Sequence, residues 1–343
     1  MRSQNTKSYF RRITSDTILI LTSVFLTSVS VYSQSDTPWV DPSPHKVSFI
    51  QVDKDVRLEV LDWGGKGRPI VLLAGGGNTT HVFDDFAVQL TKNYHVYGIT
   101  RRGFGASSYA GTDYSADRLG DDVVAVLDAL KLTKPVLVGH SLGGLEMSSV
   151  ATRYPNRIAG VIYLDAAYSY AFDNGKGSSL SQVQGEPRTP RPGPDDLASF
   201  AALAKWYAQT NGFALPESEL RQLYESTPDG RVGKRRIPQA AGKMQPPTTK
   251  YFAIPVPALA IFAVPHDLGP WLKTADATTQ EAAKKFAALE TSLTERQAKA
   301  IEEAMPTAHV VRIPNASHLV YLTNQAEVLR EMRAFIDKLQ KRS

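Results

Sequence analysis

The chain has 343 residues, of which 42% are hydrophobic and 21% are charged, close to the usage of ordinary globular proteins. This composition excludes a disordered or collagen-like chain and supplies enough apolar residues for a large core. Cysteine is absent, which excludes disulfides, thiolate-bound zinc, iron–sulfur clusters and cysteine nucleophiles. The formal net charge of +5 at pH 7 would suit an acidic partner such as a nucleic acid.

Residues 1–33 have the pattern of a secretory signal peptide. Four basic residues accompany an apolar stretch, Ile18 to Val31, that is shorter than the roughly 20 residues needed to span a bilayer. We expect cleavage near Ser33, export to the periplasm or the extracellular space, and no stable membrane insertion afterwards. The alternative is an uncleaved signal that anchors the chain at the membrane.

Most of the excess charge lies in this leader. It holds four of the 39 Lys and Arg residues and one of the 34 acidic residues, which leaves a net charge of +2 on the remainder. Nucleic-acid binding then loses its main support, and we expect no nucleic-acid partner.

Segments of strand type alternate with segments of helical periodicity along most of the chain. The expected strands are His45–Gln51, Arg57–Trp63, Pro69–Ala74, Tyr94–Thr100, Pro135–Gly139, Gly160–Leu164, Ala258–Val264 and His309–Ile313. The expected helices between and after them are His81–Leu90, Ser115–Leu130, Leu142–Tyr154, Ala275–Ala304 and Gln325–Lys341. This alternation is typical of βαβ units and predicts an α/β fold, with a mostly parallel sheet covered by helices on both faces.

The alternation is interrupted after the sixth strand. The interrupting segment contains two expected helices, near Asp195–Gln209 and Pro216–Ser226, and many aromatic residues. We interpret it as a mainly helical cap, because a structureless loop of this length and composition is uncommon. The expected organisation is a signal peptide at 1–33, the first part of the core at 34–167, the cap at 168–255 and the second part of the core at 256–343.

The strongest local motif is Gly139-His140-Ser141-Leu142-Gly143-Gly144, which follows an apolar strand and opens a helix. In that context G-x-S-x-G predicts a nucleophile elbow with Ser141 as the nucleophile. A sharp turn from strand to helix strains the serine backbone, and neighbouring glycines let the turn close.

A serine hydroxyl needs a base and an orienting acid to become nucleophilic. In this architecture the chain order is serine, then the acid, then the histidine. His318 lies just past the last strand, at the edge of the sheet where Ser141 is expected, and is our predicted base. His266 is a competitor, because it ends the preceding strand. Asp267 is our first choice for the acid, and Asp165, at the end of the sixth strand, is the alternative.

The glycine-rich segment Ala74-Gly75-Gly76-Gly77-Asn78 follows the third strand and predicts an oxyanion loop. Backbone N–H groups of Gly76 and Leu142 would stabilise the oxyanion. The segment lacks G-x-G-x-x-G, no Walker sequence occurs, and no histidine–carboxylate cluster has metal spacing. We therefore expect no cofactor and no metal.

With these residues in place, the chain from about residue 46 to 340 resembles the α/β-hydrolase fold superfamily, in its lipase- and esterase-like branch with a cap. Asp62-Trp63-Gly64-Gly65, Arg101 to Ser107 and the Asn-Ala-Ser-His segment ending at His318 are similar as well. The resemblance implies an eight-stranded sheet. Two departures stand out: Ala74-Gly75 replaces the frequent His-Gly of the oxyanion loop, and Asp267 lies one place later than the usual Gly-x-x-Asp acid.

The resemblance implies a serine hydrolase that cleaves small esters or amides through an acyl-enzyme, with carboxylic esters as the first choice. Serine at position 141 argues against epoxide hydrolase and dehalogenase chemistry, which use aspartate in this superfamily. A proline-releasing aminopeptidase, with Glu217 or Glu219 holding the substrate amine, and a perhydrolase remain alternatives, as does a non-catalytic binding protein. Trp206, Tyr207 and Trp271 are candidate substrate-binding residues, or else they pack the cap on the core.

Overall fold

A computed structural model of the chain describes residues 39–178, 185–243 and 251–340. Asp41–Ser343 form one compact unit, and of the other unit, Met1–Val40, only the last two residues are described. The predicted signal peptide lies outside the described residues. Within the described ranges, no helix combines the length and apolarity needed to cross a membrane.

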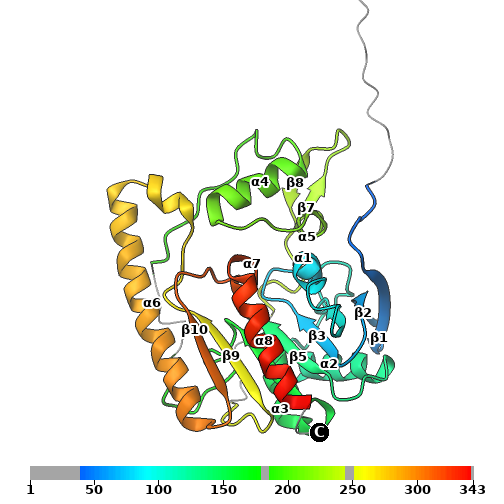
Figure 1. Cartoon of the computed structure of the whole chain (residues 1–343). Coiled ribbons are helices and arrows are strands. Elements are labelled where there is room, and N and C mark those ends of the chain that lie inside the picture. The colour runs from blue at the N-terminus through cyan, green and yellow to red at the C-terminus, as the bar shows by residue number, and fades with distance from the viewer. Residues whose placement is uncertain (1–38, 179–184, 244–250, 341–343) are drawn as a thin grey trace, which may run out of the picture. The chain divides into compact units, whose positions relative to one another are not determined.

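An eight-stranded sheet forms the centre of the larger unit, with the strand order β1-β2-β4-β3-β5-β6-β9-β10 (Figure 1). The strands are β1 (Lys46–Asp53), β2 (Val56–Gly64), β3 (Pro69–Leu73), β4 (His95–Ile99), β5 (Val136–His140), β6 (Gly160–Leu164), β9 (Ala258–Ala263) and β10 (His309–Ile313). β2 runs antiparallel to β1 and β4, and all other neighbours are parallel. The predicted α/β fold with a mostly parallel sheet is confirmed.

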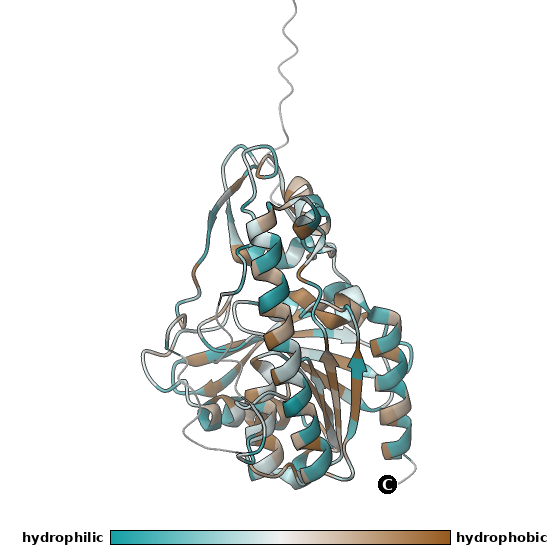
Figure 2. Cartoon of the chain, turned by 90° about the vertical axis from the view of Figure 1, so that its left-hand side faces the viewer, coloured by the Kyte–Doolittle hydropathy of each residue, from teal (hydrophilic) through white to brown (hydrophobic). Residues whose placement is uncertain are grey.

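Helices cover both faces of the sheet because the strand residues alternate between two apolar cores. Leu72 and Val138 contribute to one core, whereas Val71 and Leu137 contribute to the other. The first core is closed by η1 (Thr80–Phe83), α1 (Asp84–Ala87) and α8 (Gln325–Gln340), and the second by α2 (Ala116–Ala129), α3 (Gly143–Arg153) and α6 (Ala277–Ala304). Figure 2 shows the result: the strands are mostly hydrophobic, and the helices alternate between hydrophobic and hydrophilic residues.

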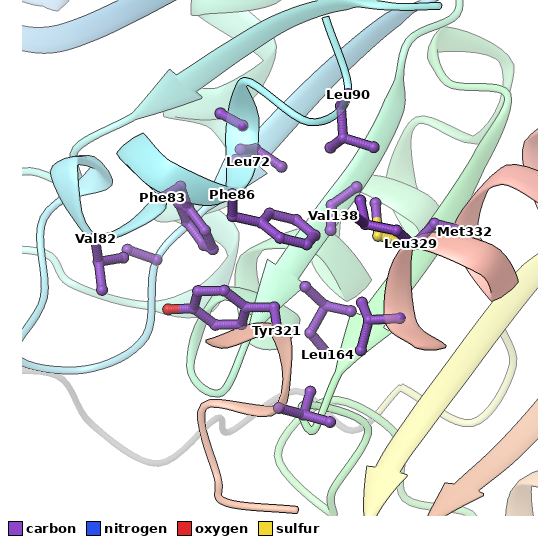
Figure 3. Close-up of a cluster of buried hydrophobic side chains, with 14 of the residues drawn as sticks. Leu72, Val82, Phe83, Phe86, Leu90, Val138, Leu164, Tyr321, Leu329 and Met332 are labelled. Carbon is purple, nitrogen blue, oxygen red and sulfur yellow. The ribbon is translucent and has the colours of Figure 1, made fainter. Parts of the chain in front are cut away.

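A buried aromatic cluster fixes the chain that follows β10. Tyr321 belongs to the short helix α7 (Val320–Thr323), and its ring centroid lies 4.9 Å from that of Phe83 and 5.4 Å from that of Phe86 (Figure 3). Such pairs contribute about 0.5–1.5 kcal/mol beyond the area that they bury. Because α7 follows the loop that carries His318, this packing holds the loop against the core.

One predicted helix is shorter in the structure. Residues 81–90 were expected to form a single helix, but they form η1, α1 and then turns, in which Gln89 N donates to Phe86 O and Leu90 N to Ala87 O. The buried residues keep helical spacing, but the backbone forms the tighter hydrogen bonds of a 3-10 helix, between residues three apart. The periodicity therefore predicted correctly which residues are buried, but the predicted length of the helix was wrong.

The segment between β6 and β9 contains two helices and a two-stranded sheet, grouped together at the top of Figure 1. Its elements are α4 (Phe200–Asn211), α5 (Glu217–Leu223), β7 (Tyr224–Ser226) and β8 (Val232–Arg235). The expected helix near Pro216–Ser226 thus ends early, because Tyr224 pairs with Arg235 across the small sheet. Two short 3-10 helices, η2 (Pro155–Arg157) and η4 (Pro270–Thr274), are the remaining helices in the described part of the chain.

Candidate active site

Ser141 lies in the sharp turn between β5 and α3. Its φ is 48°, the left-handed conformation that strains a residue with a side chain. The turn closes only because glycines flank it: a Cβ on Gly139 would lie 2.7 Å from the backbone of Gly143, and one on Gly143 would lie 2.4 Å from Leu73 O. The structure therefore has the strand–turn–helix geometry that the sequence motif predicted for Ser141.

His318 follows β10 and pairs with an acid at the end of β6. Its Nδ1 lies 2.6 Å from Oδ2 of Asp165. The His318 side chain is 44% exposed, whereas that of Asp165 is fully buried. A buried carboxylate thus fixes one nitrogen of a histidine whose ring remains open to a substrate.

The carboxylate beside His318 is therefore Asp165, the alternative acid, and the preference for Asp267 is corrected. Asp267 accepts a hydrogen bond from the backbone N–H of Gly269 at 2.9 Å, and its own N–H donates to Ala316 O. Asp267 is thus used by the local turn. β6 lies directly beside β5 in the sheet, so Asp165 ends next to the strand that carries the nucleophile.

His266, the competing candidate for the base, contacts the same oxygen of that carboxylate. Its Nε2 lies 2.6 Å from Asp165 Oδ2, and its Nδ1 lies 2.6 Å from Oε1 of Glu290 on α6. Burial alone would lower the pKa of His266, but Asp165 and Glu290 together raise it to about 10. His266 is therefore a protonated, buried side chain that orients the acid, and both of its nitrogens are occupied.

Asp165 receives two further hydrogen bonds on its other oxygen, from the backbone N–H of Ala263 at 3.1 Å and from the hydroxyl of Tyr168 at 2.7 Å. Burial would raise the pKa of Asp165, but His266 and His318 hold it well below its usual range. Asp165 is thus an ionised and immobile acceptor. Glu290 and Tyr168 had no signal in the sequence, because neither belongs to a local motif.

His140 supports the loop of His318 from beneath. Its Nε2 lies 3.0 Å from the His318 carbonyl oxygen, and the two ring centroids are 4.7 Å apart. Burial and the neighbouring His318 lower the pKa of His140 to about 3, so its ring is neutral. Because a carbonyl only accepts, the proton of His140 lies on Nε2.

The predicted oxyanion loop lies against the elbow. A Cβ on Gly75 would lie 3.1 Å from Cβ of Ser141, and one on Gly76 would lie 2.7 Å from Cδ1 of Leu142. The backbone of this loop can therefore approach a substrate held at the serine only because these side chains are absent. Gly76 and Leu142, the predicted donors, are neighbours in the structure.

A buried ion pair fixes the carbonyl side of the same loop. Arg101 donates to Ala74 O at 2.8 Å and to Gly75 O at 3.4 Å, and its Nε pairs with Glu146 on α3. The carbonyl groups are thereby held toward the guanidinium. Arg101 belongs to a motif that the sequence singled out, but only the structure shows what it contacts.

The segment between β6 and β9 reaches this loop through Glu219 on α5. The buried carboxyl of Glu219 accepts from Asn78 Nδ2 at 2.8 Å and from Thr79 N at 3.1 Å. Burial raises the pKa of Glu219 to about 7, against the lowering effect of these donors. Glu217 pairs with Arg221 at 2.7 Å. Neither carboxylate is thus free to hold a substrate amine.

A cavity of about 430 Å³ lies beside His318. Its apolar lining comes from four residues, namely Phe213, Leu268, Phe286 and Leu319. Trp206 and Tyr207, two of the candidate substrate-binding residues, line a different cavity together with Tyr224. Trp271, the third, is buried and donates to Leu268 O at 2.7 Å. Phe213 and Leu319 are thus better placed to contact a substrate at His318.

Tyr170 lies close to the nucleophile. Burial raises the pKa of its hydroxyl far above the usual range, and the nearby Ser141 side chain opposes this shift. The phenol is therefore neutral and can orient the serine hydroxyl. Tyr170 follows β6 by a few residues, and no sequence pattern distinguished it from a core tyrosine.

A serine in an elbow with a glycine loop beside it, and a histidine held by a buried carboxylate at the same edge of the sheet, are the groups that acyl-transfer enzymes use. Asp165, His266 and His318 also lie close enough together to share a metal ion. In this group, however, hydrogen bonds already join the carboxylate to both rings.

Comparison with known proteins identifies the family of the chain. The profile described as the alpha/beta hydrolase family matches residues 70–331. The bifunctional esterase/perhydrolase DCH of Acinetobacter calcoaceticus is 31% identical over 114 residues, which are 32% of this chain and 41% of that protein. The 3-oxoadipate enol-lactonase 2 of Acinetobacter baylyi is 31% identical over 115 residues, which are 33% of this chain and 43% of that protein. The chain thus matches less than half the length of these curated relatives.

Solved structures extend the likeness of fold to most of the chain. E-2-(acetamidomethylene)succinate hydrolase has a TM-score of 0.60 at 18% identity, covering 85% of this chain and 99% of that one. The carboxylesterase CesB of Bacillus subtilis has a TM-score of 0.54 at 14% identity, covering 86% and 92%. At these identities the likeness shows the fold alone.

Proposed function

The chain belongs to the alpha/beta hydrolase family, and we propose that it is a serine hydrolase that cleaves carboxylic esters through an acyl-enzyme on Ser141. The observation that carries the proposal is the 2.6 Å contact between His318 Nδ1 and the buried carboxylate of Asp165, at the edge of the sheet where Ser141 lies. The names of the relatives, an esterase/perhydrolase and a lactonase, support acyl transfer to water or a related acceptor.

In the proposed mechanism, Oγ of Ser141 attacks the acyl carbon while Nε2 of His318 takes its proton. The tetrahedral oxyanion is stabilised by the N–H groups of Gly76 and Leu142, each worth about 3–4 kcal/mol in comparable sites. His318 returns the proton to the alcohol as the ester C–O bond breaks. A water molecule, deprotonated by His318, then releases the acid and restores Ser141. Asp165 keeps the ring in the tautomer that this sequence requires.

The cavity beside His318 is lined by apolar side chains such as Phe213 and Leu319 and by polar ones such as Glu186 and Asn211, which suits a small substrate with both apolar and polar parts. A proline-releasing aminopeptidase has less support, since Glu217 is paired with Arg221 and Glu219 with the oxyanion loop. Perhydrolysis would use the same groups with peroxide in place of water.

A graded panel of p-nitrophenyl esters, from acetate to long acyl chains, tests the proposal. The wild-type chain should hydrolyse the short members, and Ser141→Ala should lower kcat by at least 10³-fold while the fold is kept. Turnover that is equal in the two proteins, or no turnover by a folded wild type, contradicts the proposal. The second result would favour a binding protein.

We also propose that the chain is exported and cleaved near Ser33, on the basis of the basic and apolar pattern of residues 1–33. Expression of the full chain in a bacterium, followed by fractionation and N-terminal sequencing, tests this. A mature N-terminus near residue 34 in the exported fraction is expected. An intact N-terminus in the membrane fraction would indicate the anchored alternative.

A further inference from the structure

A second cluster of histidines and carboxylates lies outside the active site. It consists of Asp41, His45, His81 and Asp84, each of which places one oxygen or nitrogen within 4.8 Å of the others. Asp41 and His45 precede β1, whereas His81 and Asp84 belong to η1 and α1. The spacing along the sequence gave no sign of this group, because the fold brings two distant segments together.

Three of the distances between these atoms are close to those of a metal site, and all lie within 4.8 Å. Oδ2 of Asp41 lies 3.6 Å from Nε2 of His45 and 3.6 Å from Nδ1 of His81. Oδ2 of Asp84 lies 3.5 Å from the same nitrogen of His81. Ligands at about 2.0–2.2 Å from a tetrahedral zinc ion lie roughly 3.3–3.6 Å apart. A small contraction of the group would therefore close it around one ion.

In both histidines, the ring nitrogen that does not face Asp41 lies beside a buried carboxylate. Nδ1 of His45 lies 2.7 Å from Asp84 Oδ1, and Nε2 of His81 lies 3.4 Å from Glu59 Oε1. Histidines that bind metal usually donate their second N–H to a carboxylate in this way. These contacts leave Nε2 of His45 and Nδ1 of His81 as the nitrogens that face Asp41.

One observation points to a missing partner. Nδ1 of His81 is buried and has no hydrogen-bond partner, although its side chain is only 4% exposed. Among the described residues, the ion pairs of Asp41, Glu59 and Asp84 are all with His45 and His81. Three carboxylates thus surround two imidazoles, an excess of negative charge that a divalent cation would balance.

We propose that Asp41, His45, His81 and Asp84 bind one zinc ion in a closed, structural site. Four protein ligands leave no open position for a substrate, and imidazole with carboxylate suits zinc. Asp84 also accepts a hydrogen bond from Ser218 of α5, and His81 follows the oxyanion loop closely in sequence. The ion would hold the segment before β1 to the backbone that continues from this loop.

Metal analysis of the full chain, purified without a histidine tag, tests the site. The chain is incubated with zinc and the unbound zinc is removed. Elemental analysis by inductively coupled plasma mass spectrometry should then find about one zinc ion per wild-type chain. Co²⁺ in place of zinc should give the visible absorption of a tetrahedral site. Zinc should also raise Tm of the wild type.

The variants Asp41→Asn and His81→Gln should each lose the bound ion, and Glu59→Gln should weaken binding by about 10–100-fold. Asp41 is 25% exposed, so its isosteric variant is expected to fold even if His81→Gln does not. His309→Gln, at an exposed histidine that pairs with Glu331, is the matched control and should keep one zinc.

Two results overturn the proposal. In the first, the folded wild type retains no zinc and shows no Co²⁺ spectrum, which would mean that protons alone balance the carboxylates. In the second, Asp41→Asn keeps the ion while His266→Gln loses it, which would place the metal at Asp165.

Discussion

Oδ2 of Asp165 lies 2.6 Å from Nδ1 of His318, although 153 positions separate the two residues in the chain. The contact joins the end of β6 to the loop after β10, across the end of β9. It also identifies which of two candidate aspartates can orient the histidine.

Replacing Asp165 by Asn should lower kcat by about 10³–10⁴-fold, because an amide favours the wrong tautomer of His318. Asp267→Asn is the matched control and should change kcat by less than about threefold, since its carboxylate only caps a turn. Steady-state kinetics on a short ester measure both. The reverse order of the two effects would return Asp267 to the role of the acid.

Replacing His266 by Gln should move the acidic limb of the kcat/KM profile to higher pH. The His266 ring centroid lies 5.9 Å from that of His318, and its positive charge opposes a second proton there. Glu290→Gln removes a negative charge that lies beyond His266, so it should shift the limb less and in the opposite direction, to lower pH.

A merely structural role for His266 makes a different prediction. Activity would then fall at every pH in proportion to the loss of folded protein, and the midpoint of the limb would not move. Measuring the profile on samples of equal folded fraction, as judged by circular dichroism, separates the two cases.

The Glu219 carboxyl should make the folded state less stable as the pH rises. Its folded pKa of about 7 exceeds the unfolded value of 4.5, so its contribution is fully present below pH 4.5 and is lost as the pH rises through 7. The full effect corresponds to about 3 kcal/mol in the free energy of unfolding. Urea unfolding between pH 5 and 7.5 should show this decline in the wild type and a flatter course in Glu219→Gln. Equal slopes in the two proteins would contradict the assignment.

Replacing Gly75 by Ala should lower kcat by about 10²–10³-fold, the effect of losing one oxyanion donor. The added methyl group would lie 2.7 Å from Nδ1 of His140 and 3.1 Å from Cβ of Ser141, so the loop must move away from the serine. Gly111→Ala is the control, because a Cβ there meets nothing within 4 Å. An unchanged kcat in Gly75→Ala would show that the loop does not supply the donor.

The sheet could be predicted from the sequence because each strand carries its own signal. β6 and β10 have the predicted bounds, since both are short apolar or alternating runs with clear ends. The small sheet of β7 and β8 was missed, because three residues after a helix carry no period that distinguishes strand from helix.

Ser141 and His318 could be predicted because each lies in a local motif next to a strand end. The choice between Asp165 and Asp267 could not be made in the same way, because both follow strands that end at the same edge of the sheet. Glu290 lies within α6 and Tyr170 in a loop, so only the folded chain brings them to His266 and Ser141.

Covalent labelling tests the central claim, an activated serine, most directly. The full chain is treated with a fluorophosphonate, digested, and mapped by mass spectrometry. A single adduct on Ser141, which is lost in His318→Ala and strongly reduced in Asp165→Asn, is the predicted result. An unlabelled Ser141 in correctly folded protein, or labelling that persists at the same rate in both variants, would contradict it.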